Sequence, residues 1–142
     1  MPTKTTLNAL SHSVYNLNYH LVIVTKYRRK VITQPILADL QEIFSNICVS
    51  WRCELLEFNG EPDHVHLLIS AHPNLKLSDL VNNLKTASSR RIRRKHKAHV
   101  SKFYWKPVFW HRSYCLISAG GAPLSILKQY IEQQNQQSPN SA

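Results

Sequence analysis

The pattern of hydrophobic and polar positions divides the chain into strand-like and helix-like stretches. β-Branched and aromatic residues are typical of strands, and they fill four stretches: residues 16–25, 53–60, 63–71 and 107–118. Apolar residues at spacings of three and four are typical of amphipathic helices, and three such stretches begin near Pro35, Ser78 and Pro123. The order β-α-β-β-α-β-α predicts an α+β fold of the ferredoxin-like, split βαβ plan, with an antiparallel sheet and helices on one face.

Two of the helices have clear apolar stripes. The first stripe contains Leu37, Leu40, Phe44, Ile47 and Trp51. The second contains Leu77, Leu80, Val81, Leu84 and Ser88. Both helices are expected to pack on the sheet through these stripes.

The length of 142 residues suits one domain, which we assign to residues 1–142. Residues 1–14 are polar and predict a loose arm, and the tail 138–142 is expected to be disordered. No apolar run is long enough to span a membrane, and no signal peptide pattern is present, so a cytoplasmic protein without membrane contact is expected. Cys48, Cys53 and Cys115 form no CxxC pair and are expected to be reduced thiols.

A formal net charge of +10 and a pI of about 9.8 favour a polyanionic partner. The basic residues that we assign to DNA binding form two clusters: Lys26, Arg28, Arg29 and Lys30, and Arg90, Arg91, Arg93, Arg94 and Lys95. Phe103, Tyr104 and Trp105 follow the second cluster, and aromatic side chains beside positive charge suit single-stranded nucleic acid. The alternative is that the charged run is only a solvated helix face.

The segment "DHVHLLIS" places His64 and His66 two positions apart in a predicted strand. Side chains of a strand alternate between its faces, so both imidazoles project from one face while Val65, Leu67 and Ile69 face the core. Two imidazoles on one face can chelate one cation. The alternative is that both are half-buried sheet residues satisfied by water.

The last predicted helix, "PLSILKQYIEQQNQ", places Ile126, Tyr130 and Gln134 on one stripe at steps of four. A phenol beside a metal is a candidate nucleophile. The alternative is that Tyr130 belongs to the apolar face of the helix together with Leu127 and Ile131.

Four sequence motifs together carry a resemblance to a known family. "DHVHLLIS", "FWHRSYCLIS", the Gly120-Gly121 pair and "QYIEQQ" resemble the single-tyrosine HUH transposases of the insertion-sequence 200/605 family. The resemblance covers about residues 16–137. It implies that His64, His66 and Gln134 bind a divalent metal, Mg²⁺ or Mn²⁺, and that Tyr130 is the catalytic nucleophile. Gln133 is the nearest competitor for the third ligand.

The same resemblance implies a reaction and its partners. The enzyme would cleave and rejoin single-stranded insertion-sequence ends through a 5′-phosphotyrosine intermediate, with hairpin ends of its own element as substrate. One tyrosine can hold only one DNA end, so a homodimer is expected, with active sites shared between subunits as the family has them. Asp63, next to His64, is expected to orient an imidazole.

Three alternative functions remain open from the residues. A domesticated HUH endonuclease acting on chromosomal repeat hairpins would have the same chemistry. A noncatalytic nucleic-acid-binding module could use the same fold. A two-histidine phosphoesterase would need two H-x-S/T motifs, and only His99-Val100-Ser101 fits.

Overall fold

The computed structural model describes residues 8–10, 13–120 and 124–134 of the chain. Its elements are β1 (Asn8–Leu10), β2 (Ser13–Tyr15), β3 (Leu17–Val24), the 3₁₀ turn η1 (Lys26–Arg28), α1 (Gln34–Ser50), β4 (Glu54–Glu61), β5 (His64–Ala71), α2 (Leu77–Lys95), α3 (Lys97–Val100), β6 (Cys115–Ser118) and α4 (Ser125–Gln134). The predicted disordered tail, 138–142, lies outside the described residues.

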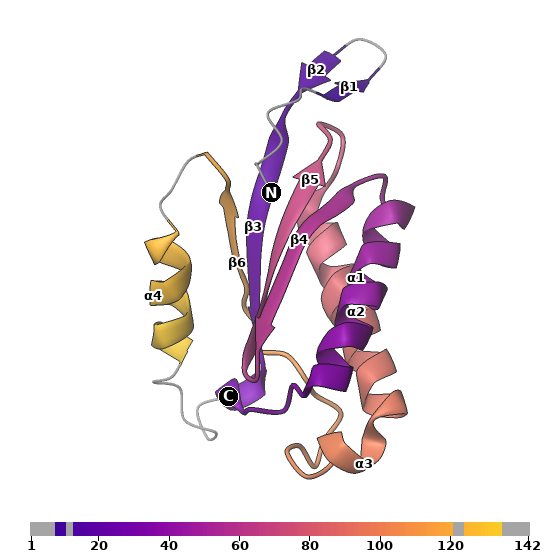
Figure 1. Cartoon of the computed structure of the whole chain (residues 1–142), viewed down its shortest axis with the longest axis vertical. Helices are drawn as coiled ribbons and strands as arrows, with labels where there is room; N and C mark the ends of the chain where they lie inside the picture. Colours follow the sequence, from indigo (N-terminus) through magenta and orange to yellow (C-terminus); the bar gives the residue numbers. More distant parts are fainter. Residues whose placement is uncertain (1–7, 11–12, 121–123, 135–142) are drawn as a thin grey trace.

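The main sheet is antiparallel, with the strand order β4-β5-β3-β6. This order is that of a split βαβ fold, so the predicted α+β, ferredoxin-like class is confirmed. Helices α1 and α2 lie together on one side of the sheet, as predicted (Figure 1). The prediction that the helices share one face is wrong for α4, which lies on the opposite side (Figure 1) because Leu127 packs on Val22 and Val24 there.

Strand β3 occupies a central position, and its last four residues are buried on both faces. Leu21 and Ile23 belong to the large core under α1 and α2. Val22 and Val24 point the other way and pack with Leu127 of α4. The continuous apolar run at the end of β3 therefore reflects helices on both sides of the sheet.

The two long helices form where the apolar periodicity places them. The Thr33 hydroxyl caps α1 by accepting a hydrogen bond from the Ile36 amide at 3.4 Å, and a proline occupies the first turn. The buried positions of α1 are Ile36, Leu40, Ile43, Phe44 and Cys48. The predicted stripe was therefore offset, since Leu37, Ile47 and Trp51 only pack partly buried at its edge. In α2 the buried residues include Leu80, Val81, Leu84 and Ser88, as predicted.

Two predictions of local structure were wrong in part. The predicted strand 107–118 pairs as a ladder only from Cys115 to Ser118, after an isolated bridge between Thr25 and Trp110. Between the bridge and the ladder, the amide of Ser113 donates to the His111 ring at 3.1 Å, a local partner in place of a neighbouring strand. Within the predicted loose arm, β1 and β2 pair as a two-stranded antiparallel ribbon.

Two further expectations concern the chemistry of the chain. Cys48, Cys53 and Cys115 are thiols, as expected, and the first two are buried. None of the described helices is both long and apolar enough to cross a bilayer.

Candidate active site and nucleic-acid surface

The two predicted histidine ligands lie near the start of β5, on the face of the sheet that α4 covers. His64 pairs with Val24 and His66 with Val22 across the ladder, and directly paired residues share a face. Both imidazoles are half-buried, whereas Val65, Leu67 and Ile69 are buried on the opposite face. The predicted alternation of β5 is confirmed.

Asp63 holds the ring of His64. Its carboxylate contacts Nδ1 of His64 at 2.8 Å and accepts a second bond from Nε of Arg28 at 2.8 Å. Burial opposes ionisation of Asp63, but the hydrogen bonds from His64 and Arg28 outweigh it and hold the pKa of this carboxyl below its ordinary value. The expected contact between Asp63 and His64 is confirmed. It leaves Nε2 of His64 as the nitrogen that faces away from the carboxylate.

The backbone next to this ion pair adopts an uncommon conformation. Tyr27 has a φ of 58° and Arg28 a φ of 54°, two consecutive residues in the left-handed region without glycine. Such residues cost about 1 kcal/mol or more each. The turn directs Arg28 towards Asp63, and Asp63 in turn holds the His64 ring. The strained backbone of the turn therefore helps to fix the position of that ring.

His66 has a partner that the sequence did not reveal. Nε2 of His66 lies 2.8 Å from Nδ1 of His20, which belongs to β3. Burial lowers the pKa of His66, and the neighbouring His20 lowers it further; burial also lowers the pKa of His20. Both rings are therefore neutral near pH 7, the state in which imidazole nitrogen binds a metal.

Tyr130 is half-buried at the inner side of α4, where it packs with the group formed by Val22, Val24 and Leu127. Its hydroxyl lies 2.6 Å from the hydroxyl of Ser113, in the segment that leads into β6. Burial raises the pKa of Tyr130, and the hydrogen bond with Ser113 opposes that shift. The phenol thus has a defined partner outside its own helix.

Gln134, one turn after Tyr130, is buried, with 7% of its surface exposed. Its amide nitrogen donates to the Tyr130 carbonyl at 3.4 Å, while its carbonyl oxygen is buried and receives no hydrogen bond from the described residues. A buried oxygen without a donor is costly, and a bound cation would satisfy it. Gln133, the competing candidate, is exposed to solvent.

The four predicted site residues share one layer of the molecule, between the sheet and α4. His64 and His66 lie on β5, whereas Tyr130 contacts the segment that leads into β6. Strand β3 lies between β5 and β6, so the axes of β5 and β6 are about 10 Å apart. No hydrogen bond between described residues joins α4 to the two histidines. The structure therefore brings the tyrosine and the histidines to one face without joining them.

The donor set fits a divalent cation. In the described ranges, no three His, Cys, Asp or Glu side chains are grouped closely enough to hold a metal, so a site here needs a donor of another type. The amide oxygen of Gln134, unsatisfied among the described residues, is such a donor, and the two imidazoles complete a mixed nitrogen and oxygen set. Asp63 supplies the supporting carboxylate that ligating histidines commonly have.

The first predicted basic cluster is largely engaged within the protein. Lys26 is buried, Arg28 pairs with Asp63, and Arg29 donates to the Phe103 carbonyl. Lys30 is exposed. Arg28 and Arg29 thus stabilise the turn between the strands, and only Lys30 offers a fully exposed charge to a ligand.

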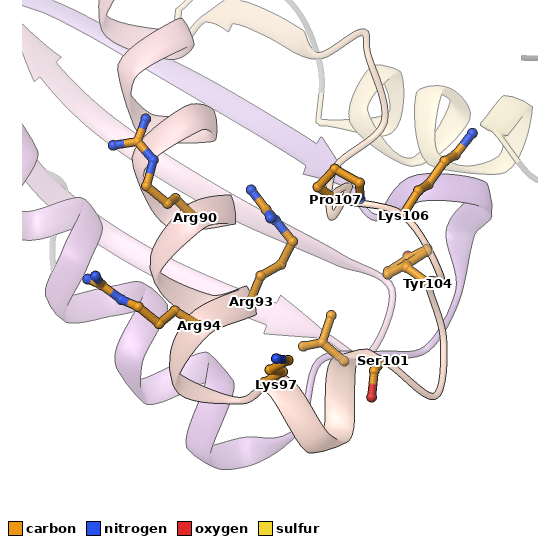
Figure 2. A pocket seen from close by; sticks show the side chains of 9 residues that line it. Arg90, Arg93, Arg94, Lys97, Ser101, Tyr104, Lys106 and Pro107 are labelled. Carbon is orange, nitrogen blue, oxygen red and sulfur yellow. The ribbon is translucent and has the colours of Figure 1, made fainter.

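Three residues of the second basic cluster, Arg90, Arg93 and Arg94, line a pocket of about 320 Å³ on the α1/α2 side of the molecule (Figure 2). Its walls come from α2, from α3 and from the loop that follows, as Figure 2 shows. The lining residues are Arg90, Arg93, Arg94, Lys97, Val100, Ser101, Tyr104, Lys106 and Pro107. Among the described residues no acidic side chain lines this pocket, so its charge is suited to a phosphate backbone.

Arg91 and Lys95 face a different surface of α2. Arg91 lines a second hollow together with Asp39 and Glu42 of α1, and Lys95 pairs with Asp39 at 3.0 Å. These two residues are therefore near acidic groups, in contrast to Arg90 and Arg93. The five basic residues predicted on α2 do not form one surface.

The three aromatic residues of the basic loop have different positions. Tyr104 is buried and donates to the Lys26 carbonyl at 2.7 Å, and Phe103 packs partly buried against the core. Trp105 is 89% exposed, and the ammonium of Lys106 lies 5.6 Å from the centre of its ring. Only Trp105 presents its ring to solvent beside the pocket.

Sequence reasoning did not find His20 and Ser113. Each touches a predicted site residue from a distant part of the chain, at sequence separations of 46 and 17 residues. The available signal was weak: His20 has the same strand parity as Val22 and Val24, so it would share their face.

This α+β fold, with a histidine pair on one sheet strand and a tyrosine on the covering helix, defines a candidate tyrosine transposase of the HUH type. The family model for IS200-like transposases matches residues 13–134. The chain therefore belongs to the IS200-like transposase family.

Individual relatives agree with this assignment. The chain is 34% identical over 122 residues to the ISDra2 transposase TnpA of Deinococcus radiodurans, which covers 86% of each chain. It is 28% identical over 126 residues to the transposase for insertion sequence element IS200 of Salmonella typhimurium, covering 89% of this chain and 82% of the relative.

Solved structures show the same fold. One of a Deinococcus radiodurans R1 protein assigned as a transposase superposes with a TM-score of 0.81 at 34% identity, over 89% of this chain and 97% of that one. Another, of a REP-associated tyrosine transposase bound to a REP hairpin, has a TM-score of 0.50 at 8% identity, over 87% and 69%. The second likeness concerns the fold alone.

Proposed function

We propose that this transposase is a metal-dependent enzyme that cleaves and rejoins single-stranded DNA at insertion-sequence ends through a 5′-phosphotyrosine on Tyr130. The observation that carries the proposal is the layer between the sheet and α4. There, the paired histidines, the phenol and a buried amide oxygen that receives no hydrogen bond from the described residues lie on one face of β3 and β5.

His64, His66 and Gln134 would hold the cation. A divalent ion bound there would polarise the scissile phosphate and offset charge that develops on its oxygens. Two nitrogen donors suit Mn²⁺ somewhat better than Mg²⁺, which prefers oxygen donors. The protein supports this site through Asp63, which holds the His64 ring, and through Arg28, which holds Asp63.

Tyr130 would form the covalent bond. Its phenolic oxygen loses its proton and attacks phosphorus, the bond from phosphorus to the 3′-oxygen breaks, and that oxygen takes up a proton, so that the departing strand leaves with a 3′-hydroxyl. The product is a 5′-phosphotyrosine, and attack of another 3′-hydroxyl reverses the step, so no nucleotide cofactor is consumed. Because burial raises the pKa of Tyr130, the hydrogen bond with Ser113 is important in stabilising the phenolate.

The pocket on α2 and α3 would bind the DNA backbone. Arg90, Arg93 and Lys97 line it, with no acidic side chain among the lining residues that the structure describes, and Trp105 offers an exposed ring on which an unpaired base can stack. A fold relative has been solved with a REP hairpin bound, which supports a hairpin end as the ligand here. The pocket and the histidine pair lie on opposite faces of the sheet, so one DNA molecule would have to pass around its edge to reach both.

We also propose a homodimer with shared active sites. A single tyrosine per site holds one DNA end, whereas excision and rejoining involve two. Leu124, just before α4, and Ile126, within it, are 59% and 39% exposed, an apolar surface that a second copy could cover. The separation between Tyr130 and the histidine strand within one chain supports an arrangement in which α4 serves the partner's metal site.

A transposase is favoured over an endonuclease that acts only on chromosomal repeat hairpins. The transposase relatives share 34% and 28% of their residues with this chain over most of their length. The REP-associated structure shares 8%.

The test is formation of a covalent protein–DNA adduct. Purified protein is incubated with labelled single-stranded DNA that carries the native element end, with Mn²⁺ or Mg²⁺, and the products are separated on a denaturing gel. A metal-dependent adduct is expected for the wild-type protein and for Tyr114→Phe, a nearby half-buried tyrosine, but not for Tyr130→Phe. An adduct that persists in Tyr130→Phe, or forms in excess EDTA, would contradict the mechanism.

A further inference from the structure

The contact between His20 and His66 has a geometry that determines which nitrogen each ring can offer. Nδ1 of His20 and Nε2 of His66 are 2.8 Å apart, the ring centres are 5.0 Å apart, and the ring planes differ by 20°. A contact this short is closer than stacked rings approach, so the nitrogens meet largely within the ring planes. This is the arrangement of an in-plane N–H···N hydrogen bond.

Such a bond contains one proton, because two neutral imidazoles each have one N–H and one unprotonated nitrogen. If the proton belongs to His66, its Nε2–H donates to His20 and its Nδ1 has an available lone pair. If the proton belongs to His20, His66 must protonate its own Nδ1 and has no lone pair left for a cation. The direction of one hydrogen bond thus decides whether His66 can be a ligand.

We infer that His20 is a positioning residue that accepts the Nε2–H of His66, so that His66 presents Nδ1 to the divalent cation while Asp63 makes His64 present Nε2. The inference rests on the proposed function, since it assumes that His64 and His66 bind the cation. It goes beyond that function by assigning His20 a role and by assigning the ligating atom of each histidine.

The two supports are alike in chemistry although they come from different elements. Ligating histidines commonly direct their second nitrogen to a carboxylate, a carbonyl oxygen or another acceptor, which fixes the tautomer and the ring orientation. Asp63, in the turn before β5, does this for His64 at 2.8 Å. His20, on β3, stands in the corresponding place for His66 at the same distance.

The wild-type protein provides the first test, with Zn²⁺ as a diamagnetic probe. Long-range ¹⁵N–¹H NMR correlations of ¹⁵N-histidine-labelled protein distinguish protonated, unprotonated and metal-bound ring nitrogens. Before metal, Nε2 of His66 is expected to be the protonated nitrogen. On addition of Zn²⁺, the nitrogens that change are expected to be Nδ1 of His66 and Nε2 of His64. A change at Nε2 of His66 would overturn the inference.

Variants at position 20 test the hydrogen bond itself. His20→Asp keeps an acceptor near the position of Nδ1 and has no proton to donate, and His20→Asn can present its amide oxygen there. Both are expected to keep the Zn²⁺ affinity within about threefold, whereas His20→Leu is expected to weaken it by about 10- to 100-fold. Loss of affinity in His20→Asp with retention in His20→Asn would mean that His20 donates, and would overturn the inference.

The outcomes separate this inference from the proposed function. If Zn²⁺ changes neither His64 nor His66 in the wild-type protein, the metal site is wrong and the role of His20 is overturned with it. If Zn²⁺ changes both histidines and His20→Leu binds as tightly as the wild-type protein, the metal site stands and only the role of His20 is overturned. Thermal unfolding of each variant shows that the comparison is made between folded proteins.

Discussion

Replacement of Gln134 by methionine should stabilise the docked helix α4 while it removes a proposed metal ligand. The carbonyl oxygen of Gln134 is buried without a hydrogen-bond donor among the described residues, and leaving such a group unsatisfied costs about 1–3 kcal/mol. Methionine has a similar length and no such oxygen. The substitution also removes the 3.4 Å bond to the Tyr130 carbonyl, which is long and therefore weak.

Relief of the unsatisfied oxygen outweighs loss of the weak hydrogen bond, so docking of α4 is expected to be about 1–2 kcal/mol more favourable in Gln134→Met when no metal is present. Hydrogen–deuterium exchange of the α4 amides, followed by mass spectrometry in EDTA, measures this difference directly. The expected result is exchange that is slower by about 5- to 30-fold in Gln134→Met than in the wild-type protein. The matched control is Gln133→Met on the exposed neighbour, for which less than about 0.5 kcal/mol is expected.

Metal should reverse which of the two proteins has the more strongly protected α4 amides. Mn²⁺ at about 100 times its Kd would protect wild-type α4 by a further ~2.7 kcal/mol, because binding to the docked state stabilises that state. Gln134→Met should gain little from the same concentration. Faster exchange of α4 in the variant in EDTA, or full protection by Mn²⁺, would refute the assignment of the orphaned oxygen as a ligand.

Three further predictions concern groups around the site. Asp63→Asn should lower the free energy of unfolding by about 1–3 kcal/mol at neutral pH. Because the pKa of Asp63 is depressed in the folded state, the stability that its carboxylate contributes is present above about pH 4 and is lost as the pH falls. Urea titrations of the wild-type protein and the variant should therefore converge below about pH 4 and stay apart above about pH 5. Ser113→Ala should raise the pKa of Tyr130 and slow adduct formation most at low pH. The pH–rate profile of adduct formation should therefore move to higher pH, and an unchanged profile would contradict this. Trp105→Ala should weaken single-stranded DNA binding by about 1–3 kcal/mol in fluorescence anisotropy, with no change in unfolding temperature.

The parts of the site that sequence reasoning could predict are those that depend on local periodicity. The alternation of a strand places His64 and His66 on one face, and the helical repeat places Gln134 one turn after Tyr130. Both relations hold whatever the rest of the chain does. The same is true of the apolar stripe of α2, which is buried as predicted.

The parts that could not be predicted depend on which strands become neighbours. His20 meets His66 only because β3 pairs with β5 in one particular register, and Ser113 meets Tyr130 only because α4 docks beside β6. Exposure within the aromatic run was equally hidden, since Tyr104 and Trp105 are adjacent and only tertiary packing decides which one is buried. Arg28 was assigned to DNA, but its backbone conformation directs it to Asp63.

The attachment of α4 has a consequence for cooperativity. The core under α1 and α2 is extensive, whereas α4 is held by a small group in which Val22, Val24 and Leu127 are the buried members. A structural unit with so little buried apolar surface opens at a lower free energy than the rest of the domain. The helix that bears Tyr130 can therefore detach and redock while the strands that bear the histidines stay folded. Tyr130 and the two histidines of β5 then belong to separate foldons of one chain, and an exchange of tyrosines between two copies would require no global unfolding.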